Sequence, residues 1–432
     1  MNIRLAAIPC LATVLLLAPG RGMAQEVAAP AADAAEEDSP YEAVHVLARA
    51  MQLIRQDYVD AGKISYKDLT YSALRGMLAD LDPHSSFMDP KAFKGMQEDT
   101  KSEFGGLGVT VTTKNNLVTI IGVTEGTPSF EAGIQPGDQI RKINGISMDR
   151  LAVADAIEML RGEPGEKVTL TISRPLTNEI KEFTIARAVI KVPSVVDATI
   201  LPEDRTGGRK IGYLRLTQFN EPTATELANA LNELEKQGME ALVMDLRFNP
   251  GGLLGSARDV CSQFLPANTR VVYTEGRPAT RDYHTRSVPG GPRKYPVAIL
   301  INGASASGAE IVAGALKDLR RAILVGETTF GKGSVQSVVA LPDGSAMRFT
   351  TAKYFTPSEK PIHEHGVEPD IRCTMTLEEE IQLTQARRRR ALQDDATAAP
   401  FDVPDRQLDR AVDALTGVLL YSERKAEPAT KG

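Results

Sequence analysis

The sequence predicts a multidomain chain of mixed α/β (α+β) class, and three patterns lead to that prediction. Apolar residues recur at helical spacing over residues 44–58 and 71–81. Short β-branched runs with one helix among them fill residues 104–187. From about residue 210, apolar strands alternate with amphipathic helices, which is typical of a sheet covered on both faces. The 432 residues are enough for two or three domains, each with its own core.

The first 24 residues have the pattern of a secretory signal peptide. Arg4 precedes an apolar stretch that ends near Leu17, and small residues surround a plausible cleavage point after Ala24. An uncleaved membrane anchor is the less favoured alternative, because the apolar stretch is short for a membrane span and contains Pro9. Residues 25–40 are rich in alanine, proline and acid, which predicts a disordered linker. We therefore expect an exported protein in the periplasm or another extracytoplasmic compartment.

Charge and cysteine content limit the partners that the chain can have. A formal net charge of −6 gives no reason to expect nucleic acid as a partner. Cys261 and Cys373 would remain after removal of the signal peptide, and they lie in separate apolar contexts without the spacing of a metal site. A disulfide between them and two free thiols are both compatible with the sequence.

Residues 41–100 form the N-terminal helical region, and residues 101–190 form a small β-rich module. The helical pattern of residues 71–81 ends before "DPHSSFMDP", which predicts a turn cluster. In the module, strands are expected at "LGVTVTT", "LVTIIGV", "KVTLTISR" and "EIKEFTIAR", with a helix at "AVADAIEMLRG".

Residues 191–375 form the α/β core. Thr223 and Glu226 have the spacing of a capping box at the start of a helix, and Gly238 would end that helix. The apolar strands "ALVMDL", "VAILI" and "AILVGE" each run into a polar, glycine-bearing loop. Residues 334–355 predict a β-hairpin that turns at Pro342-Asp343-Gly344.

Residues 376–432 form a helical tail. The run "RRRR" at 387–390 follows an acidic stretch, so a solvated helix of mixed charge is favoured over a specific anion site. "DDATAAP" at 394–400 has the composition of a flexible segment. Leu408 to Leu419 predict one more amphipathic helix, expected to dock on the body. The apolar faces of the terminal helices would serve equally well to build a homodimer.

The stretch "INGASASGAE" at 301–310 joins a buried strand to a helix. Small residues let the backbone turn sharply there, and the helix directs its free N–H groups at the turn. A serine in this position can act as a nucleophile beside an oxyanion-binding amide, or it can be an ordinary helix cap. The stretch by itself does not decide between these roles.

A nucleophilic serine needs a base, and lysine is the better candidate in this chain. None of the five histidines has a setting that suggests a triad, and His363 and His365 lack a third ligand, which favours a solvated loop over a metal site. Lys332 lies between two glycines directly after a strand, where burial can lower its pKa far enough for it to act as a base. Gln336 would hold the amine without adding charge. A solvated lysine in a β-turn is the plain alternative.

These segments together resemble the carboxyl-terminal processing peptidases, also called tail-specific serine proteases. "SASGAEIVAGALKD" and "VGETTFGKGSVQ" are similar to the family's serine and lysine motifs. Glu310 matches the motif's glutamate, which makes Ser307 the nucleophile, and Lys332 follows it at the family's spacing with Gln336 four residues further on. Gly308 and Ala309 depart from the motif, but neither position carries the reacting hydroxyl.

The resemblance also covers other parts of the chain. "DLRFNPGG" at 245–252 resembles the segment that supplies a second oxyanion amide, from Gly251 or Gly252, beside the amide of Gly308. The module at 101–190 resembles a PDZ domain inserted before a crotonase-like protease core. Five residues, Gly105, Gly106, Leu107, Gly108 and Val109, would form its tail-binding loop, where exposed amides capture a terminal carboxylate.

The resemblance implies an exported serine endopeptidase that needs no cofactor and no metal. Its substrates would be proteins with apolar carboxyl-terminal tails, with a regulatory or adaptor protein as a further partner. The first alternative is a catalytically silent adaptor that only binds tails, which the joint presence of Ser307, Lys332 and Gln336 disfavours. The second is a metal-dependent hydrolase that uses His363 and His365.

Overall fold

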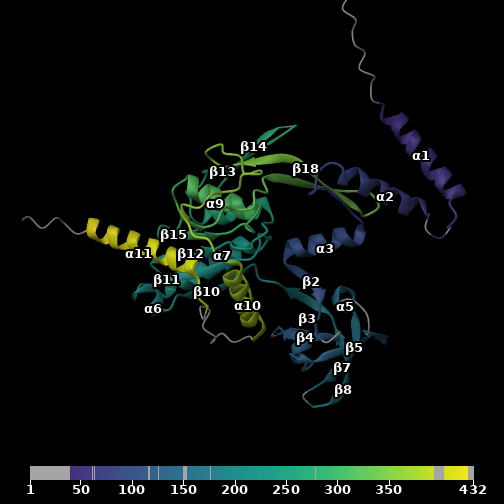
Figure 1. Ribbon diagram of the computed structural model, residues 1–432, viewed down its shortest axis with the longest axis horizontal. Helices are drawn as coiled ribbons and strands as arrows, with labels where there is room; N and C mark the ends of the chain where they lie inside the picture. Colours follow the sequence, from purple (N-terminus) through teal and green to yellow (C-terminus); the bar gives the residue numbers. More distant parts are fainter. Residues whose placement is uncertain are drawn as a thin grey trace, which may run out of the picture. The chain divides into compact units, whose positions relative to one another are not determined.

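The computed structural model in Figure 1 describes residues 39–393 and 403–426, except for 61, 63, 115–116, 125, 149–152, 176 and 278. The predicted signal peptide, nearly all of the linker and the segment 394–400 lie outside the described residues. The chain divides into two compact units, residues 1–69 and 70–432.

The first unit contains helix α1 (Pro40–Asp57) and the start of α2 (Tyr66–Ala79). Both helices were predicted, although α2 begins several residues earlier than expected. The guanidinium of Arg55 lies 4.3 Å from the centre of the Tyr66 ring. Every residue of α1 is exposed or half-buried, including the apolar Val44, Leu47 and Ile54.

The second unit is built around a six-stranded sheet with the order β10-β11-β12-β15-β16-β19. From β11 to β19 all neighbours are parallel, and only β10 runs antiparallel to β11. β12 and β15 are buried along their whole length, which explains why they appear in the sequence as continuous apolar runs. The strands are β10 (Val195–Ile200), β11 (Ile211–Leu216), β12 (Ala241–Asp245), β15 (Val297–Ile301), β16 (Ile323–Gly326) and β19 (Ile371–Arg372).

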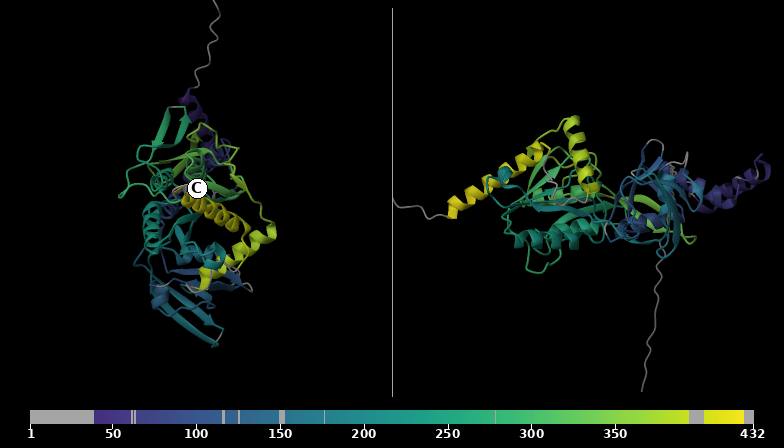
Figure 2. Two further views of the ribbon diagram at one scale, coloured as in Figure 1. Left: turned by 90° about the vertical axis from the view of Figure 1, so that its left-hand side faces the viewer. Right: turned by 90° about the horizontal axis from the view of Figure 1, so that it is seen from below.

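Helices cover both faces of this sheet, so the predicted α/β core is confirmed. One face packs on α7 (Thr223–Lys236), α8 (Leu254–Ser262) and α9 (Gly308–Asp318), and the other on α11 (Arg406–Ala426). The right-hand view of Figure 2 shows α11, in yellow, on the opposite side of the sheet from the teal helices. Leu408, Ala411 and Leu415 of α11 are buried against the sheet, so the tail helix docks on its own chain. The short α6 (Glu203–Thr206) and α10 (Leu377–Gln393) complete this part.

A second, five-stranded sheet lies beside the core, with the order β1-β18-β13-β14 and with β17 also paired to β18. The hairpin of β17 and β18 turns at the predicted residues, where Gly344 has φ 85°. The expected turn cluster before α3 (Pro90–Lys101) contains the short strand β1, which pairs with β18. The strands are β1 (Ser86–Met88), β13 (Arg270–Gly276), β14 (Thr280–His284), β17 (Ser334–Ala340) and β18 (Ala346–Phe355).

The β-rich module has its own sheet and its own hydrophobic core, which includes Ile120, Ile140 and Leu170. The sheet has the order β3-β4-β5-β7-β8, and β6 pairs with β5. A separate pair, β2 and β9, closes the module. Its elements are β2 (Glu103–Gly106), β3 (Val109–Lys114), β4 (Leu117–Val123), α4 (Pro128–Glu131), β5 (Gln139–Ile143), β6 (Ile146–Ser147), α5 (Val153–Leu160), β7 (Lys167–Arg174), β8 (Glu179–Ala186) and β9 (Ala188–Lys191).

The predicted capping box at Thr223 is wrong. The carboxylate of Glu226 accepts hydrogen bonds from the backbone N–H and the hydroxyl of Ser194, at 2.8 and 2.7 Å. A tertiary partner therefore takes the side chain that would have closed the cap.

The expectation of a wholly solvated arginine run also fails at its first residue. Arg387 forms an ion pair with the fully buried Asp245. The side chains of the other three arginines lie outside the described part of the chain.

Two observations bear on the thiols and on a membrane span. Cys261 is buried, Cys373 is half-buried, and both are free thiols. Among the described residues, no helix is both long enough and apolar enough to cross a membrane.

Candidate active site

Three loops that follow neighbouring parallel strands form the candidate active site. β12, β15 and β16 lie side by side, and their carboxyl ends lead into residues 246–252, 302–307 and 327–333. Ligands and reacting groups gather at this edge of α/β sheets because successive loops converge there. Backbone hydrogen bonds tie the loops together, from Ala306 N to the Asn249 carbonyl (2.9 Å) and from Phe330 N to the Ser305 carbonyl (3.0 Å).

Ser307 occupies a strained position at the N-cap of α9. Its φ of 52° and ψ of −111° lie where residues with a side chain are rarely found, at a cost of about 1–3 kcal/mol. The helix that it caps is buried from Gly308 to Leu316 and directs its free N–H groups toward the serine. Only 9% of the Ser307 surface is exposed, so its hydroxyl lies in a sheltered site.

The neighbouring Ser305 has a structural task. Its side chain is fully buried, donates a hydrogen bond to the Leu246 carbonyl (2.8 Å) and accepts one from Asn302 N (3.0 Å). These bonds join the first two loops and occupy the hydroxyl. Of the two serines in "SAS", the geometry therefore favours Ser307 as the nucleophile.

The carboxylate of Glu310 connects the serine loop to the lysine loop. Its Oε2 atom accepts hydrogen bonds from Ser307 N (2.8 Å) and Lys332 N (2.9 Å). Its Oε1 atom accepts from Gly331 N (2.7 Å) and from the hydroxyl of Thr329 (2.5 Å). Because one oxygen holds both amides, the backbones of Ser307 and Lys332 lie within reach of a single carboxylate. Burial raises the pKa of Glu310, while its hydrogen bonds act in the opposite direction.

The surroundings of Lys332 favour its neutral form. Burial lowers the pKa of Lys332, the nearby Arg348 lowers it further, and Glu310 opposes both effects. Gly333 allows the chain to pack closely here, since a Cβ atom at this position would lie 2.2 Å from His363 N. The lysine loop is thus pressed against residues 363–366.

Other groups that can carry positive charge surround this lysine. Arg348 has a buried Nε atom without a hydrogen-bond partner. The pKa of His84 is lowered by burial and by Lys332. His363 is half-buried and packs on Gly333, whereas Glu364 and His365 are exposed, so the expected solvated loop holds for these two residues and fails only at His363. In the described part of the chain, no group of three or more His, Cys, Asp or Glu side chains could hold a metal ion.

Gln336 makes other contacts than the predicted one. Its side-chain amide donates to Ser334 Oγ at 2.8 Å. Within the described residues, no hydrogen bond joins Lys332 Nζ to Gln336 or to Ser307 Oγ. Catalytic hydrogen bonds often tighten only when substrate is bound. The orienting role of Gln336 stays a prediction.

Two backbone amides beside Ser307 are suited to an oxyanion. Among the described residues, neither Gly308 N nor Gly252 N donates to a protein acceptor, whereas Gly251 N donates to Asn249 Oδ1 (2.8 Å). A Cβ atom on Gly308 would lie 3.4 Å from Gly252 N, so the two free amides are neighbours. Gly251 instead provides close contact, since a Cβ atom there would lie 2.7 Å from Ser307 Cβ. Of the two predicted glycines, Gly252 is the better oxyanion donor.

A second candidate site lies in the β-rich module. A cavity of about 210 Å³ is lined by the loop 106–109, by β3 and by the end of α5, including Ile157 and Leu160. Within the described residues, the amides of Leu107 and Gly108 have no protein acceptor. Gly105 does not line the cavity, because it packs on Gly162, whose N–H donates to the Gly105 carbonyl (3.1 Å).

Comparison with known proteins assigns the chain to a family. Residues 210–373 match the model of peptidase family S41. The carboxy-terminal-processing protease of Bartonella bacilliformis is 41% identical over 316 residues, which cover 72% of this chain and 71% of that protein. The carboxyl-terminal-processing protease of Synechocystis sp. PCC 6803 is 37% identical over 377 residues, covering 87% and 83%. The chain belongs to the carboxyl-terminal processing proteases.

Two further matches concern the architecture of this carboxyl-terminal processing protease. Residues 119–174 match the model of a PDZ domain, which confirms the predicted nature of the β-rich module. A protein of Bacteroides fragilis NCTC 9343, provisionally classed as an S41 protease, shares the fold with a TM-score of 0.51 at 20% identity, covering 85% of this chain and 97% of its own. The protein is therefore a serine peptidase of family S41 that carries a PDZ domain.

A buried ion network lies beside the loop 246–252 of this carboxyl-terminal processing protease. Arg247 lies just before the turn and is almost fully buried. Its guanidinium pairs with Asp245 (2.7 Å) and with Asp405 (2.7 and 2.9 Å), and it also contacts Gln407 (3.0 Å). Asp405 and Gln407 lie at the start of α11, so the tail of the chain contacts the loop that follows β12.

Sequence reasoning missed three functional features of the site. Glu310 entered only as a match to a motif, although its place three residues after Ser307 is the spacing of a capping box and was a usable signal. Arg348 lies on a hairpin strand with no local feature that marks it. Asp405 follows the segment "AAPFDVP", and nothing nearby in the sequence relates it to Arg247.

Proposed function

We propose that this chain is an exported serine endopeptidase that holds protein substrates by their carboxyl-terminal tails in its PDZ groove and cleaves them with a Ser307–Lys332 dyad. The observation that carries the proposal is the Glu310 carboxylate, which holds the backbones of both residues beside two free amides. That arrangement has the parts that acyl transfer needs: a nucleophile, a base of lowered pKa and oxyanion donors.

The catalytic cycle follows from these parts. Neutral Lys332 takes the proton of Ser307 as the serine oxygen attacks a peptide carbonyl. The amides of Gly252 and Gly308 stabilise the oxyanion of the tetrahedral intermediate. Lys332 then gives its proton to the leaving amine, and an acyl-enzyme remains. A water molecule, deprotonated by Lys332, attacks the ester and releases Ser307 with its proton restored. Gln336 would orient the lysine once substrate is present.

The PDZ groove accounts for the choice of substrate. Its free amides at Leu107 and Gly108 suit a terminal carboxylate, and β3 offers an edge on which an extended peptide can pair. The apolar lining from Leu160 and Ile157 favours a tail with an apolar last residue.

The compartment and the oligomeric state belong to the same proposal. The signal-like first 24 residues support export to the periplasm or a comparable compartment. The exposed apolar residues of α1 support a homodimer. An adaptor protein that delivers substrates would fit an enzyme that selects tails.

The test is cleavage of an unfolded reporter protein that ends in an apolar tail. We expect cleavage by the mature protein, loss of cleavage in Ser307→Ala and in Lys332→Ala, and weak cleavage when the tail is amidated. Ser305→Ala is the matched serine control and should retain cleavage if it folds. Full activity of Ser307→Ala would contradict the proposed nucleophile.

The catalytically silent adaptor is the second candidate, and the free amides of the groove favour it as much as they favour a protease. It predicts that the mature protein binds the tail peptide, by fluorescence anisotropy, but never cleaves the reporter. Loss of both binding and cleavage would contradict tail recognition itself.

A further inference from the structure

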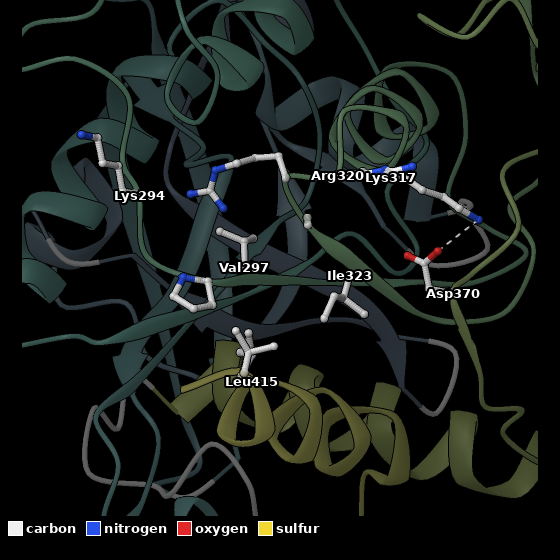
Figure 3. A pocket seen from close by; sticks show the side chains of 11 residues that line it. Lys294, Val297, Lys317, Arg320, Ile323, Asp370 and Leu415 are labelled. Atoms are coloured by element: carbon white, nitrogen blue, oxygen red, sulfur yellow. Dashed lines mark ion pairs between the residues drawn. The ribbon is translucent and has the colours of Figure 1, made fainter. Parts of the chain in front are cut away.

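A second cavity lies at the amino ends of β15 and β16, the ends opposite to the candidate active site. It has a volume of about 440 Å³, within the range of small-molecule sites. Val297 and Ile323, the first residues of β15 and β16, line it together with Leu415 and Val418 of α11. Figure 3 shows Leu415 rising from α11 toward Val297 and Ile323. The catalytic loops leave the other ends of these strands, so the cavity is separate from the proposed active site.

Positive charge dominates the rim of this cavity. Four cationic side chains line it, against one carboxylate, that of Asp370. Asp370 is already engaged, because it forms an ion pair with Lys317 (3.5 Å) and accepts a hydrogen bond from Leu324 N (2.9 Å). Three cations therefore remain without a counter-charge among the described residues: Lys294, Arg320 and Arg321.

Arg321 is the most deeply placed of these cations. Its guanidinium donates to the carbonyl oxygens of Phe264 (3.1 Å), Arg293 (2.8 Å) and Tyr295 (2.9 Å), and it pairs with no carboxylate in the described part of the chain. Backbone carbonyls satisfy its hydrogen bonds but do not neutralise its charge. A half-buried cation of this kind is stabilised when an anion enters the cavity.

Arg320 has an unusual backbone. It follows the end of α9 with φ 54°, a position where glycine is the ordinary residue. The adjacent hydrogen bond from Ala322 N to the Leu316 carbonyl (3.1 Å) belongs to the same helix-ending turn. Arginine at this position adds strain to the turn but places an exposed cation on the rim of the cavity.

We propose that this cavity binds a small amphipathic anion, a carboxylate or phosphate head group on a short aliphatic chain. The uncompensated cations Lys294, Arg320 and Arg321 would receive the head group. The apolar wall from the two strand starts and α11 would receive the chain. A bound molecule would contact both the sheet and α11, so it would stabilise the docked tail helix. This inference does not depend on the proposed protease activity.

The test is calorimetric titration of the full chain carrying Ser307→Ala, with three probes below their micelle concentrations. Sodium octanoate supplies head and chain, inorganic phosphate supplies the charge alone, and octyl glucoside supplies a neutral head on an alkyl chain of similar length. The PDZ groove also suits a carboxylate, so every titration is run with that groove saturated by an apolar-tailed peptide. We expect one site for octanoate, and binding of the other two probes at least about tenfold weaker.

Two substitutions connect the binding to this cavity. Lys294→Ala and Arg320→Gly each remove one exposed cation. Glycine also tolerates the positive φ of position 320 without strain, so neither substitution should lower the melting temperature. We expect each to weaken octanoate binding by about tenfold. Lys181→Ala, on the PDZ hairpin, is the matched control and should change nothing.

Three results would overturn the proposal. Octanoate binding that survives both substitutions would place the site elsewhere. Equal binding of octyl glucoside would show that the cations do not matter. Equal binding of phosphate would reduce the cavity to a simple anion site and remove the role of its apolar wall.

Discussion

Glutamine at position 310 would keep the size and shape of the glutamate and remove only its charge and one acceptor. The wild-type carboxylate accepts four hydrogen bonds, two on each oxygen. A glutamine amide can place its NH₂ group only where a partner is able to accept. Thr329 can do so through its hydroxyl, so we expect the NH₂ group on that side and the amide oxygen still facing Ser307 and Lys332.

The cost follows from this geometry. Gly331 N would lose its acceptor, and an unsatisfied buried donor costs about 1–3 kcal/mol. The bonds to Ser307 N and Lys332 N would change from charge-assisted to neutral ones, at about 0.5–1 kcal/mol each. Together the loss is about 2–5 kcal/mol, much of the stability of an ordinary domain. Alanine would remove the acceptor of all four donors, so glutamine is the more informative substitution.

In Glu310→Gln the backbones of Ser307 and Lys332 should also shift relative to each other. Misplacement of reacting groups by about 1 Å can reduce a rate by about 10²-fold. We expect kcat for the tailed reporter to fall by about that factor, with the dissociation constant of the tail peptide unchanged because the PDZ groove is untouched. Glu368→Gln, which makes the same chemical change on an exposed side chain, should retain full activity. A folded Glu310→Gln variant with unaltered kcat would refute the proposed role of the carboxylate.

Three further predictions concern the surroundings of the site. Arg348→Met removes a cation that lowers the pKa of Lys332, so that pKa should rise. Since the neutral amine is the base, the acid limb of the pH profile of kcat/KM should move to higher pH. An unmoved limb would contradict the assignment of Lys332 as the base. Asp405→Asn leaves the buried Arg247 with one carboxylate fewer, and urea unfolding at pH 7 should show a loss of about 3–5 kcal/mol. Because the pKa of Asp405 is lowered in the folded state, its stabilising contribution is present above about pH 4 and disappears as the pH falls through the folded pKa. On acidification below pH 4, the free energy of unfolding should therefore fall less in the variant than in wild type. An equal fall in both proteins would count against the pair. Gly252→Ala would place a methyl group 2.1 Å from the backbone carbonyl oxygen of Phe219, at a residue with φ 146°. We expect kcat to fall by about 10²–10³-fold, while binding of the tail peptide, measured by fluorescence anisotropy, stays the same. A fully active variant would show that the Gly252 amide is not an oxyanion donor.

The elements of the core could be predicted because their side-chain periodicity is local. β12 and β15 are buried on both faces and therefore appear as unbroken apolar runs, while α7 and α11 show one apolar stripe each. The capping box failed for the opposite reason. Its spacing was present, but Ser194, outside the helix, competed successfully for the carboxylate of Glu226.

Sequence reasoning also predicted only part of the candidate active site. Ser307 and Lys332 were identified through their resemblance to motifs of a family, and local chemistry alone left a helix cap and a solvated lysine as alternatives. The structure added a reason to choose Ser307 over Ser305, because the hydroxyl of Ser305 is committed to the Leu246 carbonyl. It also separated Gly252 from Gly251, which sequence reasoning could not, because only the folded turn shows which amide is already used.

The sequence by itself determined the order of the secondary-structure elements, the presence of a separate β-rich module and the loops in which chemistry would be found. Those properties depend on residues that are close together along the chain. Tertiary structure alone decided that Glu310 joins the serine and lysine loops, that Arg247 pairs with an aspartate 158 residues away, and that uncompensated cations surround an apolar cavity under α11. Such contacts are set by how strands and helices pack, and the same residues at the same sequence distances would carry no signal in an unfolded chain.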